Sequence, residues 1–187
     1  MRPSFYLSVV KQRGLFRVYP FTMLERLGET EQSPEYHPEG NVWIHTLMVT
    51  DEAAKIKRKS KNPLALMLAA LLHDLGKPDT FKNINGKITA YNHDVAGARL
   101  SAEFLNALTD DGALIRSVSG LVRWHMQILY VTRFNRFSEF SKMRHETDVR
   151  EVALLALCDR LGRGNTDREE EIRNIGDFLN RCGIPDG

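Results

Sequence analysis

The segment Leu64–Pro78, LALMLAALLHDLGKP, constrains the fold of this chain more than any other part of it. It is an apolar run of helical character that ends in an adjacent histidine and aspartate, His73 and Asp74. Burial of an imidazole beside a carboxylate is costly unless both groups find a partner. A divalent metal ion would compensate both groups, and Lys77 would add a cation beside the same position. The segment therefore predicts a buried polar site at the end of a core helix.

The same segment carries signals that end a helix. Gly76 tolerates the left-handed backbone conformation that often follows a helix, and Pro78 cannot continue one. We therefore expect the helix to stop here, with Gly76 in a left-handed turn. Taken by itself, this segment leaves a second interpretation open, in which His73 and Asp74 are a chance pair at a helix end.

Composition places the chain among ordinary globular proteins. Its 187 residues suggest a single domain, 1–187, that is long enough to bury a core. The net charge of +2 favours neither a nucleic-acid coat protein nor an acidic tail, so an anionic ligand must bind a local basic patch.

Cys158 and Cys182 form no CxxC pair, which excludes a zinc ribbon. Without a signal peptide or an apolar run of about 20 residues, we expect no membrane span and a cytoplasmic protein.

Hydrophobic periodicity predicts an all-α domain of about seven helices with one small β-hairpin. The helices are expected at about 5–11, 42–59, 64–73, 94–108, 110–130, 148–161 and 167–181, with a further short helical piece around 22–27. The expected N-terminal caps are Asn41, Asp94, Asp148 and either Thr109 or Asp110. Asn85-Gly86 is a strong signal for a two-residue hairpin turn.

Six side chains that can bind metal stand at positions that this pattern buries or brings to helix ends. They are His45, His73, Asp74, His93, His125 and Asp159. One histidine on an apolar face is usually a core residue with an ordinary hydrogen bond. Four histidines with two inward carboxylates are much harder to explain in that way, since clusters of such groups mark functional sites. We therefore predict that these six residues bind metal.

The chemistry of the donors indicates which metals would bind. Nitrogen and oxygen donors without a thiolate suit Mn, Fe, Co or Ni, or Mg that keeps some of its waters. Six protein ligands are more than one catalytic ion uses, because such an ion needs open positions. We expect two ions that share Asp74, roughly 3.5–4 Å apart, as in binuclear sites that activate water and clamp a phosphoryl group. Lys77 would stabilise the charge that develops on the phosphate.

The order and approximate spacing of His45, His73-Asp74 and Asp159 resemble the four-ligand signature of the HD-domain metal-dependent phosphohydrolases. The additional His93 and His125 are similar to the ligands of members that use a second metal. The resemblance implies an all-α HD-domain helical bundle. It assigns the first ion to His45, His73, Asp74 and Asp159, and the second to Asp74, His93 and His125.

A longer pattern resembles the C-terminal HD domain of bacterial CCA-adding tRNA nucleotidyltransferases. It comprises His37-Pro38-Glu39, Trp43–Met48, His73–Pro78, Asn92-His93-Asp94 with Gly97-Ala98, and Val122–Met126. The sequence shows no Gly-Ser and paired-aspartate motif of the nucleotidyltransferase head, so we expect no nucleotide addition by these residues. In the multifunctional relatives, this domain hydrolyses 2′,3′-cyclic nucleotides and acts as a 2′-nucleotidase and phosphatase. The resemblance therefore implies phosphoester hydrolysis.

The expected substrate is a small phosphorylated molecule, a phosphomonoester or phosphodiester of a nucleotide, and RNA is a further partner to consider. Asp74 and Lys77 are the predicted catalytic residues. Phosphate is predicted to contact Lys77, and also Arg160 and Arg163, which follow Asp159 at the end of the same helix.

Two alternatives to a binuclear hydrolase are left open by the sequence. One is a one-metal nucleotidase in which His93 and His125 contact the substrate. The other is a non-catalytic nucleotide- or RNA-binding regulatory module that retains the HD fold. The aromatic and basic segment Phe134–Arg144 is interpreted either as a lid over a pocket or as a hydrophobic flap with solvated charges.

Overall fold

The structure, a computed structural model, describes residues 2–133 and 138–184 and is dominated by helices, as the sequence predicts. Seven of the described helices have ten or more residues, in agreement with the expected number. The α-helices are α1 (Pro3–Gln12), α2 (Thr22–Glu25), α3 (Val42–Ile56), α4 (Pro63–Leu72), α5 (Lys77–Thr80), α6 (His93–Asn106), α7 (Gly112–Trp124), α8 (Gln127–Thr132), α9 (Phe140–Glu146), α10 (Val149–Leu161) and α11 (Arg168–Arg181). Short 3₁₀ turns are η1 (Leu15–Arg17), η2 (Arg26–Glu29) and η3 (Lys57–Lys59).

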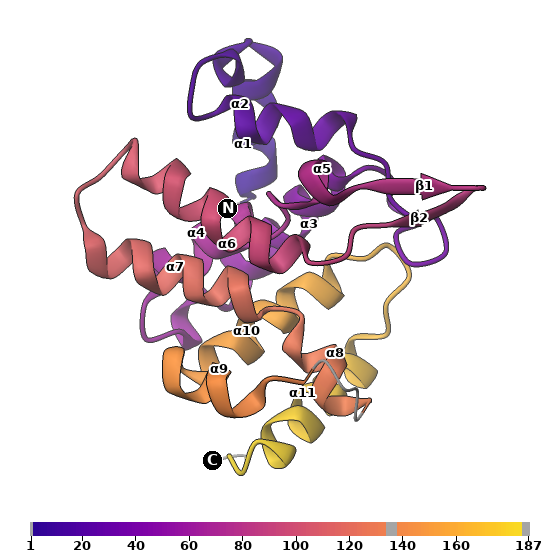
Figure 1. The fold of residues 1–187 in the computed structure, drawn as a ribbon, viewed down its shortest axis with the longest axis vertical. Coiled ribbons are helices and arrows are strands. Elements are labelled where there is room, and N and C mark those ends of the chain that lie inside the picture. Colours follow the sequence, from indigo (N-terminus) through magenta and orange to yellow (C-terminus); the bar gives the residue numbers. More distant parts are fainter. Residues whose placement is uncertain (1, 134–137, 185–187) are drawn as a thin grey trace.

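Helix α4 lies at the centre of the bundle and packs against α3, α7 and α10 (Figure 1). Its sequence is almost wholly apolar, and Leu66, Ala69, Ala70 and Leu72 are fully or almost fully buried. A helix that is apolar all round is stable only when other helices cover every side of it. Helix α10 packs on both α3 and α4, and α6 lies along α7. The ends of α4, α7 and α10 and one face of α3 therefore meet inside the protein.

The predicted hairpin forms from β1 (Lys82–Ile84) and β2 (Lys87–Thr89), which pair antiparallel and project from the bundle (Figure 1). The turn residues Asn85 and Gly86 have φ values of 54° and 82°. Positive φ at both central residues is the geometry of the two-residue turn that this dipeptide favours. The hairpin prediction is confirmed.

Three of the predicted helix starts are confirmed by capping hydrogen bonds. The side chains of Asn41, Asp148 and Asp167 accept hydrogen bonds from backbone N–H groups in the first turns of α3, α10 and α11. This contact satisfies donors that a helix start would otherwise leave unpaired.

Two predicted caps are wrong. Helix α7 is capped by Asp111, whose carboxylate accepts from the two N–H groups of Ala113 and Leu114, in place of Thr109 or Asp110. Asp94 lies inside the first turn of α6, not at its cap, and its carboxylate pairs with Arg123 at 2.7 Å. A long-range ion pair to α7 thus uses the side chain that was expected to cap the helix.

The helix predicted to run continuously to Tyr130 is interrupted at His125. Helix α7 ends at Trp124, and α8 begins at Gln127. The imidazole Nδ1 of His125 is hydrogen-bonded to the carbonyl of Val122 at 2.7 Å. The interruption therefore coincides with a predicted site residue whose ring is fixed by the last turn of α7.

Helix α4 ends at Leu72, before Gly76, and the glycine is required for a different reason from the one expected. Its φ is −79°, so the predicted left-handed turn is wrong. A Cβ at this position would lie 2.1 Å from the carbonyl oxygen of His93 and 2.6 Å from the backbone nitrogen of Gly97. Gly76 is thus needed because the backbones approach closely. Pro78 stands in the first turn of α5, where a missing N–H is tolerated, so it begins a helix after the break.

Substitution of Gly76 by alanine is expected to lower the free energy of unfolding by about 1–3 kcal/mol, because the methyl group overlaps backbone atoms that cannot rotate away. Gly112→Ala is the matched control, since its methyl group meets only the flexible end of Arg116. The control should change the unfolding free energy by less than about 1 kcal/mol. Urea unfolding of the two variants measures this difference, and equal midpoints would contradict the close approach at Gly76.

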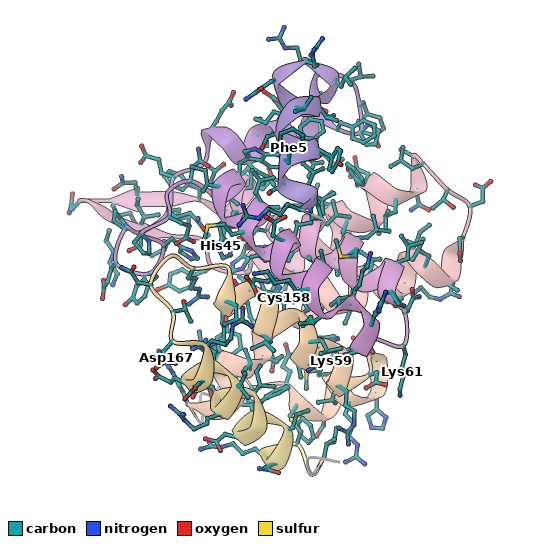
Figure 2. All side chains as sticks on the ribbon, turned by 180° about the vertical axis from the view of Figure 1, so that it is seen from behind. Phe5, His45, Lys59, Lys61, Cys158 and Asp167 are labelled. Carbon is teal, nitrogen blue, oxygen red and sulfur yellow. The ribbon has the colours of Figure 1, made fainter. Side chains whose placement is uncertain are left out.

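A further prediction concerns Cys158, which is not one of the predicted metal ligands. Cys158 is a buried core residue, as expected. Figure 2 shows Lys61 on one side of the lower half of the molecule and Asp167 on the other, with Lys59 and Cys158 between them and His45 above.

The interpretation of Phe134–Arg144 as a lid or flap falls partly on residues 134–137, which lie outside the described residues, while α9 begins at Phe140. Within residues 2–133 and 138–184, no helix is both long and apolar enough to cross a bilayer. The assignment of 1–187 to one domain stays a prediction.

Candidate metal centre

The fold brings all six predicted metal-binding side chains into one buried cluster. His45 comes from α3, Asp159 from α10 and His93 from the first turn of α6. His73 and Asp74 follow the end of α4, and His125 follows the end of α7. All six residues are buried: His45, His73, Asp74, His93, His125 and Asp159. The convergence follows from the packing of α3, α4, α6, α7 and α10 around a common interior.

Asp74 lies at the middle of this cluster. Its Oδ2 is 3.2 Å from His73 Nε2, 3.9 Å from His45 Nε2 and 2.7 Å from Lys77 Nζ. Its Oδ1 is 3.6 Å from His93 Nε2. One carboxylate thus faces three imidazoles and one ammonium group, a position from which it can bridge two cations.

Backbone carbonyls fix the protonation of three histidines. The Nδ1 atoms of His73, His93 and His125 lie within hydrogen-bond distance of the carbonyl oxygens three residues before them. The acceptors are Ala70, Ala90 and Val122, at 3.0, 2.7 and 2.7 Å. A carbonyl oxygen only accepts, so Nδ1 carries the proton and Nε2 of the neutral ring keeps its lone pair. This second hydrogen bond is the usual support of a metal-binding histidine.

The unprotonated Nε2 atoms of His73, His93 and His125 lack hydrogen-bond donors within the described part of the protein. His93 Nε2 and His125 Nε2 are only 3.2 Å apart, and in the neutral rings both are lone-pair donors. Among the described residues, buried His73 Nε2 has no hydrogen-bond partner. An unpartnered buried polar atom is costly, and a cation would satisfy all three nitrogens. The donors present therefore fit a metal ion.

His45 is held between two carboxylates. Its Nδ1 lies 2.8 Å from Glu39 Oε1, and its Nε2 lies 2.9 Å from Asp159 Oδ1. Burial by itself would lower the pKa of His45, but hydrogen bonds to Asp159 and Glu39 raise it above its ordinary value. A positive charge is therefore favoured at Nε2, where either a proton or a metal ion can supply it.

The pKa shifts favour ionised carboxylates at Asp74 and Asp159 and neutral imidazoles at His93 and His125, whereas His45 is favoured in its protonated form. Burial opposes ionisation of Asp74 and Asp159, but the charges of His73 and Lys77 on the first, and of Arg163 on the second, bring each pKa well below its usual range. Burial, together with the charge of His93, lowers the pKa of His125 to about 4. Metals bind deprotonated ligands, so Asp74, Asp159, His93 and His125 are in the protonation state that binding requires, whereas a cation would replace the proton at His45 Nε2.

Two groups of three ligands share Asp74. One comprises His45, His73 and Asp74, and the other comprises Asp74, His93 and His125; within each group the ligand atoms lie within 4.8 Å of one another. The sequence predicts Asp159 as a fourth ligand of the first ion; Asp159 lies outside the first group of three and contacts His45 at 2.9 Å. The two ligand sets stay a prediction. Nitrogen and oxygen donors suit divalent ions that prefer such ligands.

Four residues of the cluster, Asp74, His93, His125 and Asp159, line a pocket of about 390 Å³. Lys77, Arg160 and Arg163, the three predicted phosphate contacts, all line it. The two arginines differ in their partners. Arg160 pairs through Nε with Glu171 of α11, whereas Arg163 Nη2 lies 3.5 Å from Asp159 Oδ2. Arg163 is therefore held beside the cluster, while Arg160 is anchored to the neighbouring helix.

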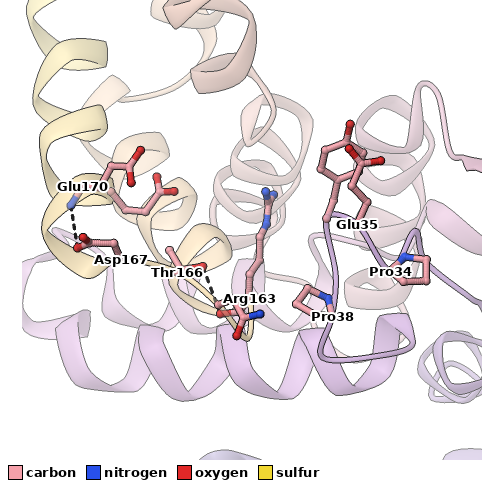
Figure 3. Close-up of a pocket in the computed structure, with 10 residues that line it drawn as sticks. Pro34, Glu35, Pro38, Arg163, Thr166, Asp167 and Glu170 are labelled. Carbon is pink, nitrogen blue, oxygen red and sulfur yellow. Dashed lines mark hydrogen bonds between the residues drawn. The ribbon is translucent and has the colours of Figure 1, made fainter.

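A second pocket of about 330 Å³ adjoins the first, and Tyr36 and Arg163 line both. Figure 3 shows Arg163 between the loop that carries Glu35 and the turn that leads into α11 at Asp167. Acidic side chains contribute much of the lining of this second pocket. Its charge makes it a poor place for phosphate, which leaves the first pocket as the candidate anion site.

Two residues that hold the site in place were not identified as site residues from the sequence. Gln32 is buried, and its Oε1 accepts a hydrogen bond from Lys77 Nζ at 2.6 Å. Glu39 contacts both His37 and His45. Both residues belong to the loop before α3, so neither follows a helical periodicity. The only sequence signal was His37-Pro38-Glu39 within the longer family pattern.

The fold and the cluster define an all-α protein with a buried histidine and carboxylate site for divalent cations. A protein-family model described as the HD domain matches residues 42–164. Relatives called "Multifunctional CCA protein" include one from Methylococcus capsulatus, which is 30% identical over an alignment of 192 positions that covers 95% of this chain and 41% of that protein. Another, from Halorhodospira halophila, is 32% identical over an alignment of 186 positions that covers 95% of this chain and 42% of that protein. A third, from Actinobacillus pleuropneumoniae, is 37% identical over 106 residues, 57% and 25% of the two chains.

The chain belongs to the HD-domain family, which is part of a superfamily of metal-dependent phosphohydrolases. The matched region contains all six residues of the cluster, whereas Gln32 and Glu39 precede it. HD domains bind divalent metal ions, and the shared groups around Asp74 could hold them. The chain spans less than half the length of the three relatives named above.

Proposed function

We propose that this protein hydrolyses a phosphomonoester or phosphodiester of a nucleotide, with two divalent cations in the buried cluster. The observation that carries this proposal is the shared position of Asp74 between two groups of imidazoles beside an open pocket. A binding module has no need for two such groups, and their bare Nε2 atoms favour a catalytic metal site over a regulatory one. The activity expected is of the 2′,3′-cyclic phosphodiesterase and phosphatase type.

The residues assigned to the cations follow the two groups. His45, His73, Asp74 and Asp159 would hold the first, and Asp74, His93 and His125 the second. Divalent cations bound there supply Lewis acids that activate water and neutralise charge on phosphoryl oxygens. Mn, Fe, Co, Ni and Mg are the candidate ions for this nitrogen and oxygen donor set.

Lys77 would contribute a fixed positive charge to the substrate phosphate. Its Nζ is hydrogen-bonded to Gln32 and paired with Asp74, so the flexible side chain is held at one place beside the cluster. A preorganised charge stabilises a developing anion more than a mobile one does. Arg163 and Arg160, which also line the pocket, would add positive charge that favours phosphate binding.

The walls of the pocket support a nucleotide as substrate. Tyr36, Phe81, Tyr91 and Tyr130 line it together with the cationic residues. Aromatic faces stack on bases of any kind, whereas the cations bind phosphate. RNA is a further possible substrate, because the relatives named above are CCA proteins.

Assays on a panel of substrates test the proposal. The panel comprises 2′,3′-cyclic nucleotides, 2′-, 3′- and 5′-nucleoside monophosphates and a short RNA, each with added Mn²⁺, Co²⁺ or Ni²⁺. Hydrolysis of at least one nucleotide ester is expected. Nucleotide binding without turnover under any of these metals would contradict the enzyme and favour the regulatory module. Turnover with a single bound ion would favour the one-metal nucleotidase.

Replacement of Lys77 by methionine is expected to lower kcat on the preferred ester by about 100–1000-fold, because it removes one fixed donor to the transition state. Methionine keeps most of the aliphatic stem and removes the charge. Lys87→Met is the control, since Lys87 is exposed on the hairpin. Steady-state kinetics measure both variants. An unchanged kcat in Lys77→Met would exclude Lys77 from the reaction.

A further inference from the structure

Glu39 is a buried carboxylate in the loop that precedes α3, and only 2% of its side chain is exposed. Its Oε1 lies 2.9 Å from His37 Nδ1 and 2.8 Å from His45 Nδ1. Its Oε2 accepts a hydrogen bond from the backbone N–H of Gly164 at 3.3 Å. One side chain therefore joins the loop, α3 and the end of α10. A buried carboxylate with this many donors has a defined position.

The contacts of Glu39 decide where two imidazoles carry their protons. An ionised carboxylate only accepts hydrogen bonds, so His37 Nδ1, which is hydrogen-bonded to Glu39, carries a proton. His45 Nδ1 lies 2.8 Å from the same oxygen as an ion pair, and a nitrogen that faces a negative charge at this distance carries a proton as well. The Nε2 of each ring is then the atom available for a cation or substrate. For His45, this Nε2 faces Asp159 at 2.9 Å and Asp74 at 3.9 Å. His45 Nε2 and Asp159 Oδ1 each carry a lone pair, so a proton or a metal ion must lie between them at a separation of 2.9 Å.

His37 extends the same arrangement to the pocket. Its ring lies 4.7 Å from that of His45, measured between centroids, at an angle of 75°. The side chain lines the pocket above the cluster. With Nδ1 directed to Glu39, the Nε2 on the other side of the ring is an acceptor for a hydroxyl group of a bound substrate.

We propose that Glu39 is a positioning residue that fixes the tautomer and orientation of His45 and His37, and thereby sets the cation affinity of the site. This inference rests on the metal centre of the proposed function. Partners behind a ligating histidine typically change metal affinity by 10–100-fold when they are removed. Glu39 does for His45 what the carbonyls of Ala70, Ala90 and Val122 do for the other three histidines.

A carboxylate in this place has an effect that the carbonyls do not. It adds a negative charge behind His45, which makes Nε2 a stronger donor to a cation. It also links His45 to a residue of the pocket wall. If Glu39 served the fold alone, through its hydrogen bond to Gly164, its removal would change the stability of the protein but not the affinity for metal.

The test uses the metal-free protein and the variants Glu39→Ala and Glu39→Gln, with Glu35→Ala as the control from the same loop. Glu35 is exposed and lies outside the cation cluster. Calorimetric titration with Mn²⁺ is expected to give a dissociation constant about 10–100-fold weaker for Glu39→Ala and unchanged for Glu35→Ala. Glu39→Gln should lie between, since its amide oxygen still accepts a hydrogen bond but lacks the charge.

Imidazole ¹⁵N NMR of the metal-free proteins at pH 8 gives a readout that does not depend on metal. His37 is expected as the Nδ1–H tautomer in the wild type and as the Nε2–H tautomer, which free histidine prefers, in Glu39→Ala. Wild-type Mn²⁺ affinity in both folded Glu39 variants would overturn the positioning role, as would an unchanged His37 tautomer.

The outcomes separate this inference from the proposed function. If the wild type itself binds no Mn²⁺, the proposed metal centre fails, and the assignment of Glu39 to cation binding is overturned with it. If the wild type binds Mn²⁺ but the variants bind it equally well, the metal centre stands and the role of Glu39 is overturned. If Glu39→Ala does not fold, the nearly isosteric Glu39→Gln is used in its place, and weaker Mn²⁺ binding by Glu39→Gln than by the wild type supports the inference.

Discussion

Replacement of Asp74 by asparagine is expected to lower kcat by about 1000-fold or more. Asp74 is the one side chain shared by both groups of candidate ligands, so its change weakens both cation sites at once. Each cation contributes several kcal/mol of charge stabilisation to the transition state, and every 1.36 kcal/mol corresponds to a tenfold change in rate. Asparagine fills nearly the same volume, so the fold around it should persist.

The metal-free Asp74→Asn protein tests whether the loss is local. Asp74 pairs with Lys77 at 2.7 Å, so its replacement leaves the ammonium group without its charged partner and should destabilise the metal-free fold modestly, by about 1–3 kcal/mol. Asp79→Asn is the control, because Asp79 pairs with Arg26 and Arg99 outside the pocket. Activity within tenfold of wild type in Asp74→Asn would exclude Asp74 as the shared ligand.

Removal of the cations is expected to abolish activity and to lower the melting temperature by about 5–10 °C. A ligand at 100 times its dissociation constant stabilises the folded state by about 2.7 kcal/mol. For a chain of this size, each kcal/mol corresponds to about 2–4 °C. The physical source of the effect is the set of bare Nε2 atoms and ionised carboxylates, which have poor partners until a cation binds.

The measurement compares protein treated with chelator, the same protein after addition of Mn²⁺, Co²⁺ or Ni²⁺, and a sample with potassium chloride of equal ionic strength. The divalent ions should restore both melting temperature and activity, whereas the potassium salt should restore neither. In Asp74→Asn the stabilisation by Mn²⁺ should be smaller than in the wild type. A melting temperature that no divalent ion changes would count against the metal centre.

Much of the architecture could be predicted from the sequence because it depends on local patterns. The apolar run of α4, the Asn85-Gly86 turn and the cap at Asn41 each follow from a few neighbouring residues. The burial of His45 follows from its place on the apolar face of α3. The same periodicity places Asp159 inside the bundle, on α10.

The errors arose where a tertiary contact decides the local structure. The conformation of Gly76 depends on the backbone of α6, which is not adjacent in sequence. Asp94 pairs with Arg123 instead of capping its helix. Nothing in the local pattern distinguishes Asp94 from a true cap such as Asp148.

The site residues that the sequence did not identify lie in the loop before α3. Gln32 contacts Lys77, and Glu39 contacts His45 and Gly164, all of which lie in other segments of the chain. Irregular segments have no periodicity from which such contacts can be read. The sequence also could not distinguish the two arginines that follow Asp159. The structure does so, because Arg160 pairs with Glu171 whereas Arg163 lies beside Asp159.

Elemental analysis of protein purified without chelator, and again after loading with Mn²⁺, Co²⁺ or Ni²⁺, tests the central claim most directly. The two groups of ligands that share Asp74 predict about two divalent cations per chain, and one or none in Asp74→Asn. A single cation in the fully loaded wild type would contradict the binuclear centre. No cation under any loading condition would contradict the metal-dependent hydrolase as a whole.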